Sequence, residues 1–175
     1  NVNGNILLFN INSEEKQYAQ KSYEGNLISS VRWANNNMVI AVSDKQFIAV
    51  DAGGREKWTY KYNDDVLNYF DISNNNNLVL VTGGSSLDRH MKVKSISMSG
   101  RLKGEYEYEG DIINISASDD STLISSMHDS VMINKNGRKK AYFKSEKEIY
   151  SGYKYKNSGY VFLDEGGYAE VFLMK

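Results

Sequence analysis

The sequence predicts an all-β protein: a β-propeller, or a propeller segment, with about four blades of four-stranded antiparallel sheet. Three observations lead to this fold class. Apolar and aromatic runs of about five to eight residues alternate with short clusters of Asn, Asp, Gly and Ser, as strands alternate with turns. A turn pattern recurs about every 40 residues, which is the period of a propeller blade. The chain has no Pro, so Asn, Asp, Gly and Ser must make its turns.

The recurring pattern is a small polar residue followed three positions later by glycine and then arginine. The first full copy reads D-x-x-G-R and begins at Asp51, and Trp58 follows it. The next copy reads S-x-x-G-R, with its glycine at Gly100, and the last reads N-x-x-G-R, with its glycine at Gly137. A degenerate copy lies upstream, at Asn10. The small polar side chain caps the turn through its oxygen, and the glycine, Gly54 in the first full copy, takes a left-handed conformation. We expect Trp58 to pack between adjacent blades.

The repeat divides the chain into one continuous propeller segment, residues 1–175. Its expected parts are a partial blade at 1–26, whole blades at 27–63, 64–110 and 111–147, and a partial blade at 148–175.

Each blade is expected to contain strands in the same order. The first-position strands are Ile28–Trp33, Val66–Ile72, Ile112–Ala117 and Tyr150–Tyr155. The second-position strands are Met38–Ser43, Asn77–Thr82, Thr122–Met127 and Tyr160–Leu163. The third-position strands are Asn5–Ile11, Phe47–Asp51, Met91–Ser97, Val131–Asn134 and Ala169–Leu173. The fourth-position strands are Glu14–Tyr23, Arg55–Tyr62, Arg101–Tyr108 and Arg138–Lys144.

The composition argues against several classes of partner and site. The 175 residues suffice for one domain with a sizeable core. A net charge of −1 gives no reason to expect a nucleic-acid partner or a polybasic membrane contact. The absence of Cys excludes disulfides, thiol catalysis and thiolate metal sites. No apolar run approaches the 18–20 residues, roughly, that span a bilayer.

The stretch from Ala49 to Trp58, which carries Asp51 and Gly54, resembles the PQQ-like repeat of quinoprotein-type propellers. The distance from Asp51 to Trp58 is one residue shorter than in the cofactor-binding enzymes of that superfamily. The resemblance implies the fold, and it implies a branch without quinone, such as envelope scaffold proteins and membrane-anchored propellers of Gram-positive bacteria. No calcium ligand set or catalytic Asp of the enzymes is seen, so we expect no cofactor, no metal and no catalytic residue.

The expected strands do not close a complete ring of propeller blades. The chain begins with Asn rather than Met, and the expected strands do not make whole blades at either end. Because an open sheet edge invites association, we expect a C-terminal half of a longer propeller, with any signal or anchor lost, or a homodimer that covers the open edges.

The longest connection, Gly83–His90, is the first candidate site. It contains Ser85, Ser86, Asp88, Arg89 and His90. A Ser/His/Asp set invites a hydrolase interpretation, but members of a catalytic triad converge from separate elements rather than from eight consecutive residues. We expect a partner-contact loop or an ordinary long hairpin.

Two tyrosine-rich strands are the second candidate site. Tyr106 and Tyr108 alternate with glutamates, and Tyr153 and Tyr155 alternate with lysines. Alternation places each pair of tyrosines on one face of its strand. They form either an aromatic binding surface or ordinary packing between blades.

The sequence therefore predicts a non-catalytic binding or scaffold module of a bacterial envelope protein, outside the cytoplasm, that contacts protein or cell-wall glycan. The alternative is an enzyme or ligand sensor whose site needs further blades. A purely structural repeat is the third interpretation.

Overall fold

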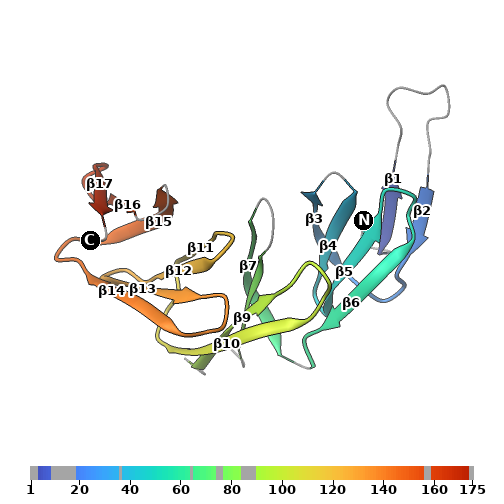
Figure 1. The fold of residues 1–175 in the computed structure, drawn as a ribbon, viewed down its shortest axis with the longest axis horizontal. Helices are drawn as coiled ribbons and strands as arrows, with labels where there is room; N and C mark the ends of the chain where they lie inside the picture. Colours follow the sequence, from blue (N-terminus) through green and yellow to red (C-terminus); the bar gives the residue numbers. More distant parts are fainter. Residues whose placement is uncertain are drawn as a thin grey trace. The chain divides into compact units, whose positions relative to one another are not determined.

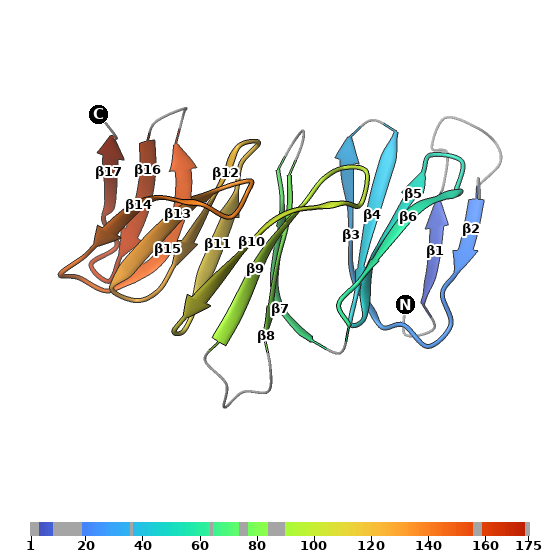
Figure 2. The same cartoon turned by 60° about the horizontal axis from the view of Figure 1, so that its bottom comes forward.

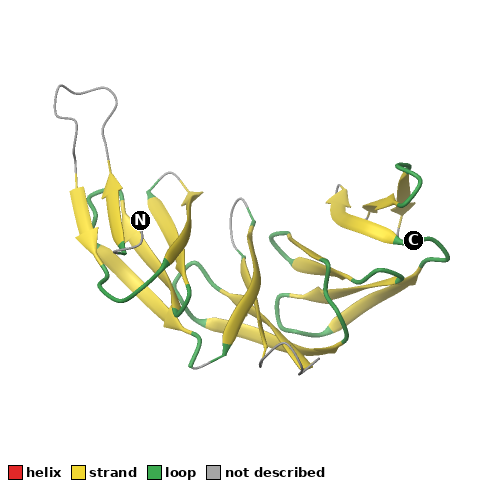
Figure 3. Ribbon diagram, turned by 180° about the vertical axis from the view of Figure 1, so that it is seen from behind, coloured by secondary structure: helices red, strands yellow, loops and turns green. Residues whose placement is uncertain are grey.

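A computed structural model describes residues 4–8, 19–35, 37–63, 65–73, 77–83, 90–155 and 159–173. These residues form 17 strands, β1 to β17, and no helix (Figure 1, Figure 3). The all-β prediction is confirmed. No segment of the described ranges is a helix of the length and hydrophobicity needed to cross a membrane.

The strands form five sheets in chain order, each built from consecutive strands. The first sheet holds β1 (Asn5–Leu8) and β2 (Ala19–Ser22). The second holds β3 (Ile28–Asn35), β4 (Met38–Ser43), β5 (Gln46–Asp51) and β6 (Glu56–Lys61). The third holds β7 (Val66–Ile72), β8 (Leu78–Gly83), β9 (His90–Ile96) and β10 (Leu102–Glu109). The fourth holds β11 (Asn114–Ala117), β12 (Ser121–Ser125), β13 (Asp129–Asn134) and β14 (Lys139–Lys144). The last holds β15 (Ile149–Tyr155), β16 (Gly159–Asp164) and β17 (Ala169–Leu173).

Each sheet falls within one of the ranges that the repeat predicts for a blade. Several strand ends differ by one or two residues from the expected ones, among them the end of β3 at Asn35 and the start of β13 at Asp129. The first pair is observed only as β1 and β2, because residues 9–18, including the degenerate turn copy at Asn10, lie outside the described part of the chain. Strand β11 begins at Asn114, two residues later than predicted. Strand β12 ends at Ser125, because Ser126 closes a tight turn by donating its N–H to the carbonyl of Asp129 at 2.8 Å.

The chain folds into two compact units. The first contains residues 1–67 and 99–101, and the second contains residues 68–98 and 102–175. In the first unit, Ile6 of β1 packs against the β3–β6 sheet in a common core; its buried members are Ile6, Ile28, Val39, Ala41, Ile48 and Val50.

In the second unit, successive sheets pack face to face (Figure 2). One core lies between the sheets that contain β8 and β12; its buried members include Val79, Val81, Val93, Ile115, Ile124 and Val131. The next core joins the sheets that contain β12 and β16; its buried members are Leu123, Met132, Ile149, Tyr160 and Phe162. Each sheet therefore buries apolar side chains on the face that meets its neighbour, as the blades of a propeller do.

The first strands of successive sheets are also linked by hydrogen bonds. The Ala117 N–H on β11 donates to the Asp71 carboxylate on β7 at 2.7 Å. The Gly152 N–H on β15 donates to the Asn114 side chain on β11 at 3.1 Å. Lys154 donates to Asp120 at 2.7 Å and to Ser118 at 3.1 Å. Polar contacts thus fix the stacking of the sheets within the second unit.

Three hairpin turns share one geometry. In each, an Asx side chain accepts two backbone N–H groups, those two and four residues later. Asp51 accepts from Gly53 and Arg55 at 2.9 Å, and Asn134 accepts from Asn136 and Arg138 at 3.0 Å. Asp164 accepts from Gly166 at 3.0 Å and from Tyr168 at 2.9 Å. The glycine of each turn has positive φ, between 75° and 77°.

The turn glycines also bring turns close to a neighbouring strand. A Cβ on Gly100 would lie 2.7 Å from the Trp58 ring, so the indole covers this turn within the first unit. A Cβ on Gly137 would lie 2.1 Å from the carbonyl oxygen of Glu105 on β10. Only glycine fits these two close approaches.

Candidate functional site

The last sheet carries the candidate site, because its two faces have different surroundings. Register places Tyr153 opposite Val161, and Val161 opposite Val171. One face of this sheet presents the side chains of Tyr153, Tyr155, Val161, Leu163 and Val171; we call these residues the exposed face. The other face presents Tyr160, Phe162, Glu170 and Phe172 toward the β11–β14 sheet.

The exposed face is apolar and accessible. The side chains of Tyr153, Leu163 and Val171 retain 50%, 40% and 53% of their accessible surface. Faces with this kind of composition are buried between sheets elsewhere in the second unit. Exposed apolar side chains gathered on one face make this face a candidate contact surface.

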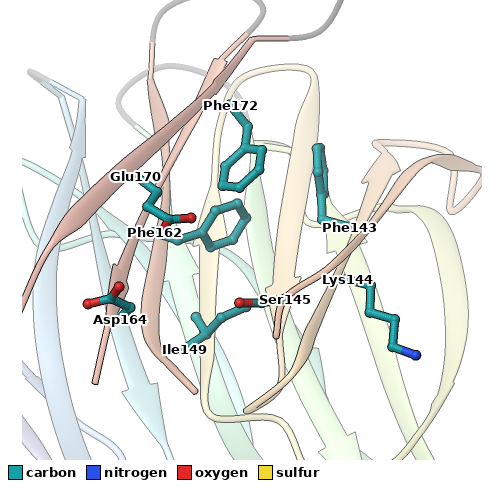
Figure 4. Close-up of a pocket in the computed structure, with 8 residues that line it drawn as sticks. All are labelled: Phe143, Lys144, Ser145, Ile149, Phe162, Asp164, Glu170 and Phe172. Atoms are coloured by element: carbon teal, nitrogen blue, oxygen red, sulfur yellow. The ribbon is translucent and has the colours of Figure 1, made fainter. Parts of the chain in front are cut away.

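The opposite face ends in an aromatic groove beside β17. Phe143 of β14, Phe162 of β16 and Phe172 of β17 point toward one another there (Figure 4). Their ring centroids lie 5.4 Å apart for Phe162 and Phe172, and 6.0 Å apart for Phe143 and Phe172. The inclined rings are favourable aromatic pairs. We call these three residues and Glu170, which also lines the pocket, the phenylalanine groove.

One lysine links the two carboxylates at this end of the sheet. The Lys147 ammonium lies 2.8 Å from the Asp164 carboxylate and 3.2 Å from that of Glu170. Hydrogen bonds to Asp164 and Glu170 raise the pKa of Lys147. The pKa of Asp164 is lowered, first by the hydrogen bond from Lys147 and next by the backbone N–H of Tyr168.

For Tyr106 and Tyr108, the structure favours the second interpretation, ordinary packing between blades. Tyr108 is buried and donates its hydroxyl to Asp129 at 3.2 Å, and Tyr106 packs against the same core. These tyrosines fill the space between two sheets because their face of β10 meets β13 and β14. Tyr153 and Tyr155, in contrast, lie on the exposed face.

Of the candidate loop, Ser85, Ser86, Asp88 and Arg89 lie outside the described residues. His90, at the start of β9, is exposed, and its Nδ1 lies 3.7 Å from the Glu109 carboxylate. In the parts of the chain that are described, no group of three or more His, Asp or Glu side chains is arranged to hold a metal ion.

A polar cleft lies in the first unit, lined by Asp44, Lys45, Lys61, Tyr62 and neighbouring residues. The Tyr62 ring is buried and meets Phe47 edge to face, with centroids 5.8 Å apart. Within the described ranges its hydroxyl has no hydrogen-bond partner. No local stretch of sequence signals this cleft or the phenylalanine groove, since both combine residues from separate strands and turns.

Comparison with known proteins places the chain in a family. A family model, "Family of unknown function (DUF5711)", matches residues 1–173, so the chain belongs to this family. No curated protein matches the chain in sequence.

Solved structures resemble the chain in fold at low sequence identity. The computationally designed Ika4 protein has a TM-score of 0.61 at 12% identity, covering 87% of this chain and 94% of its own. BBS1N, solved in complex with ARL6DN, has a TM-score of 0.60 at 11% identity, covering 91% of this chain and 56% of its own. BamB from Moraxella catarrhalis has a TM-score of 0.58 at 11% identity, covering 98% and 54%.

The chain thus spans little more than half the length of BBS1N and BamB. Together with the stacked antiparallel sheets, these likenesses confirm the predicted β-propeller-like fold.

Proposed function

We propose that this chain is a non-catalytic protein-binding module, and that the exposed face of the last sheet is its contact surface. The exposed face carries this proposal. Tyr153 offers a rigid ring with a polar tip, and Leu163 and Val171 offer aliphatic surface beside it, a combination common in the cores of protein interfaces. The structure of BBS1N with a protein partner supports a protein, rather than a glycan, as the ligand class.

We also propose which branch of the PQQ-like propellers the chain belongs to and where in the cell the protein lies. The match of Asp51, Gly54 and Trp58 to the PQQ-like repeat supports the superfamily, and the Asp51-to-Trp58 distance, one residue shorter than in the cofactor-binding enzymes, supports a non-enzymatic branch. The resemblance to envelope scaffold proteins supports a place in the bacterial cell envelope, outside the cytoplasm. Protease treatment of intact cells tests this location, because a protein exposed at the cell surface is degraded. Detection of the protein in membrane or wall fractions would place it in the envelope beneath the surface.

A matched pair of leucine variants tests the binding surface. Leu163→Asp places a charge on the exposed face, and Leu102→Asp places one at a leucine of similar exposure, 49%, at the start of β10. A charge at the centre of an apolar interface costs more than about 1.4 kcal/mol, which is tenfold in affinity. Each tagged variant is cross-linked in cells of the source organism, and the captured proteins are quantified.

We expect Leu163→Asp to lose a specific captured protein at least tenfold, while Leu102→Asp keeps it. Equal capture by both variants would contradict the assignment of this face. Capture of wall glycan in place of protein would overturn the ligand class, and saturable turnover of a small molecule would overturn the non-catalytic assignment.

A further inference from the structure

The turn capped by Asn134 differs in charge from its counterpart at Asp51. In both turns, the Oδ1 atom of the cap accepts the backbone N–H groups two and four residues later. Residues 51–57 include two acidic and two basic side chains, whereas residues 134–140 include four basic side chains and no acidic one. The two turns therefore share a backbone geometry but not a charge.

At the first of these turns, the second oxygen of the cap holds two cations. Asp51 Oδ2 lies 2.9 Å from Arg55 Nε and 3.8 Å from Lys57 Nζ. Lys57 is the extra residue at the bulge of β6. One aspartate thus caps the turn through one oxygen and pairs with both cations through the other.

The second turn keeps these two cations but lacks the carboxylate. Arg138 lies four residues after the cap, as Arg55 does. Lys140 is the extra residue at the bulge of β14, as Lys57 is at the bulge of β6. Because Asn134 caps through Oδ1, its Nδ2 donor takes the place of the second carboxylate oxygen. Within the described ranges, the side chains of Arg138 and Lys140 and the Nδ2 atom of Asn134 have no hydrogen bond or ion pair.

The surroundings hold these three donors in place and add positive charge. The turn packs tightly on β10, since a Cβ on Gly104 would lie 2.1 Å from the backbone of Asn136. The pKa of Lys103 is lowered, first by burial and next by the nearby charge of Lys135. A rigid turn that already presents its donors loses little conformational freedom when an anion binds.

The groups that remain available indicate the class of anion. The four backbone N–H groups of residues 135–138 are all donated within the protein, so none is left to surround a compact phosphate. The neighbouring strand β10 exposes Glu105, Glu107 and Glu109, so an extended polyanion such as a membrane surface would meet like charge. A single carboxylate on a short acidic peptide segment fits the three donors better.

We propose that Asn134, Arg138 and Lys140 bind an aspartate or glutamate side chain of a partner protein. The bound carboxylate takes the position that the second oxygen of the capping aspartate has in the first turn. Lys135 and Lys139, which are exposed beside the site, favour further acidic residues next to it in the partner. The inference goes beyond the proposed function, because it adds a second contact on a different sheet from the exposed face.

Exchanging the two cap residues tests the proposal. A fluorescein-labelled oligoglutamate peptide is titrated with the full chain at low ionic strength, and binding is followed by anisotropy. Asn134→Asp supplies the carboxylate from within the turn, so it should weaken binding about threefold, the size of one exposed ion pair. Asp51→Asn frees Arg55 and Lys57, so it should strengthen binding about twofold by creating a second site of the same kind.

Two arginine variants at the same turn position form a matched pair. Arg138→Gln should weaken binding about threefold. Arg55→Gln should leave binding unchanged, because Arg55 is already paired with Asp51. Leu163→Asp should leave it unchanged too, which separates failure of this site from failure of the exposed face. Urea unfolding checks that each variant is folded, and Asp and Asn both cap this type of turn in the native chain.

The proposal is overturned if the wild-type chain does not bind the peptide, if both arginine variants lose equal affinity, or if Asn134→Asp binds as the wild type does. Vesicles that contain phosphatidylglycerol and a short DNA duplex are titrated in parallel. Binding of either one in place of the peptide would overturn the choice of a protein partner.

Discussion

The turn glycines show how much a single residue contributes to this fold. Gly137 and Gly167 occupy the same position of the same turn type, with φ of 76° and 75°. Their surroundings differ: a Cβ on Gly137 would meet the Glu105 carbonyl oxygen at 2.1 Å, whereas a Cβ on Gly167 meets nothing within 4 Å. Gly167 therefore requires glycine only for its left-handed backbone conformation, whereas Gly137 requires it also because the β10 backbone lies so close.

Gly167→Ala should destabilise the protein by about 1–2 kcal/mol, the cost of a left-handed residue with a Cβ. Gly137→Ala should cost distinctly more, because strand β10 must also move away from the turn. Urea unfolding of both variants measures the difference. Equal losses would show that the contact between this turn and β10 contributes nothing to stability.

Buried tyrosines are a second feature at the residue scale. Burial raises the pKa of the Tyr108 hydroxyl to about 12, and burial raises the pKa of Tyr62 and Tyr160 as well. The neutral form is favoured in the folded state. The stabilisation is complete below pH 10, roughly the unfolded pKa, and is lost as pH rises through the folded value.

We expect the urea midpoint to fall between pH 10 and pH 12, and to fall less steeply in Tyr108→Phe. The Tyr108→Phe variant also loses the hydrogen bond from the hydroxyl to Asp129. The fall of its urea midpoint is therefore measured relative to its own midpoint at pH 8. Tyr150→Phe, at an exposed tyrosine, is the control. The explanation fails if Tyr108→Phe keeps the alkaline slope of the wild type.

At the scale of elements, the hairpin β16–β17 depends on a charged turn. Asp164 caps the turn through Gly166 and Tyr168 and pairs with Lys147, so the last sheet is tied to the segment between β14 and β15. Because the pKa of Asp164 is lowered in the folded state, its stabilisation is present above its ordinary pKa and is lost as pH falls through the folded value.

Thermal unfolding between pH 2 and pH 6 measures this contribution. Asp164→Asn should lower the melting temperature at pH 6 and flatten its decline toward acid pH. Lys147→Gln should flatten the decline too, since its ammonium is the largest cause of the lowered pKa. Slopes equal to that of the wild type in both variants would remove Asp164 from the acid response.

The sequence predicts the ends of some strands better than those of others. Strands β4, β7 and β17 begin and end where the hydrophobic runs and turn clusters place them. The end of β12 differs, because Ser126 and Asp129 close a turn through their side chains, at 2.9 Å, inside a run that looks strand-like. Side-chain capping of this kind competes with strand extension and leaves little trace in hydropathy.

At the scale of the whole molecule, five sheets in chain order account for the repeat. Each four-stranded sheet is one whole copy of the unit, and the period of about 40 residues can be recognised because the copies carry similar turn residues. Within each unit, neighbouring sheets share buried apolar cores. The repeat predicts this packing, since a single blade cannot bury its own apolar faces.

The sequence by itself determined the all-β class and the turn at Asp51, because these depend on local patterns: alternation, turn residues and period. Only the tertiary structure decided which tyrosines are exposed. Tyr108 and Tyr153 sit in similar alternating stretches, yet one meets the next sheet and the other lies on the exposed face. The phenylalanine groove likewise depends on β14 and β17 lying together in space, so no local stretch of sequence encodes it.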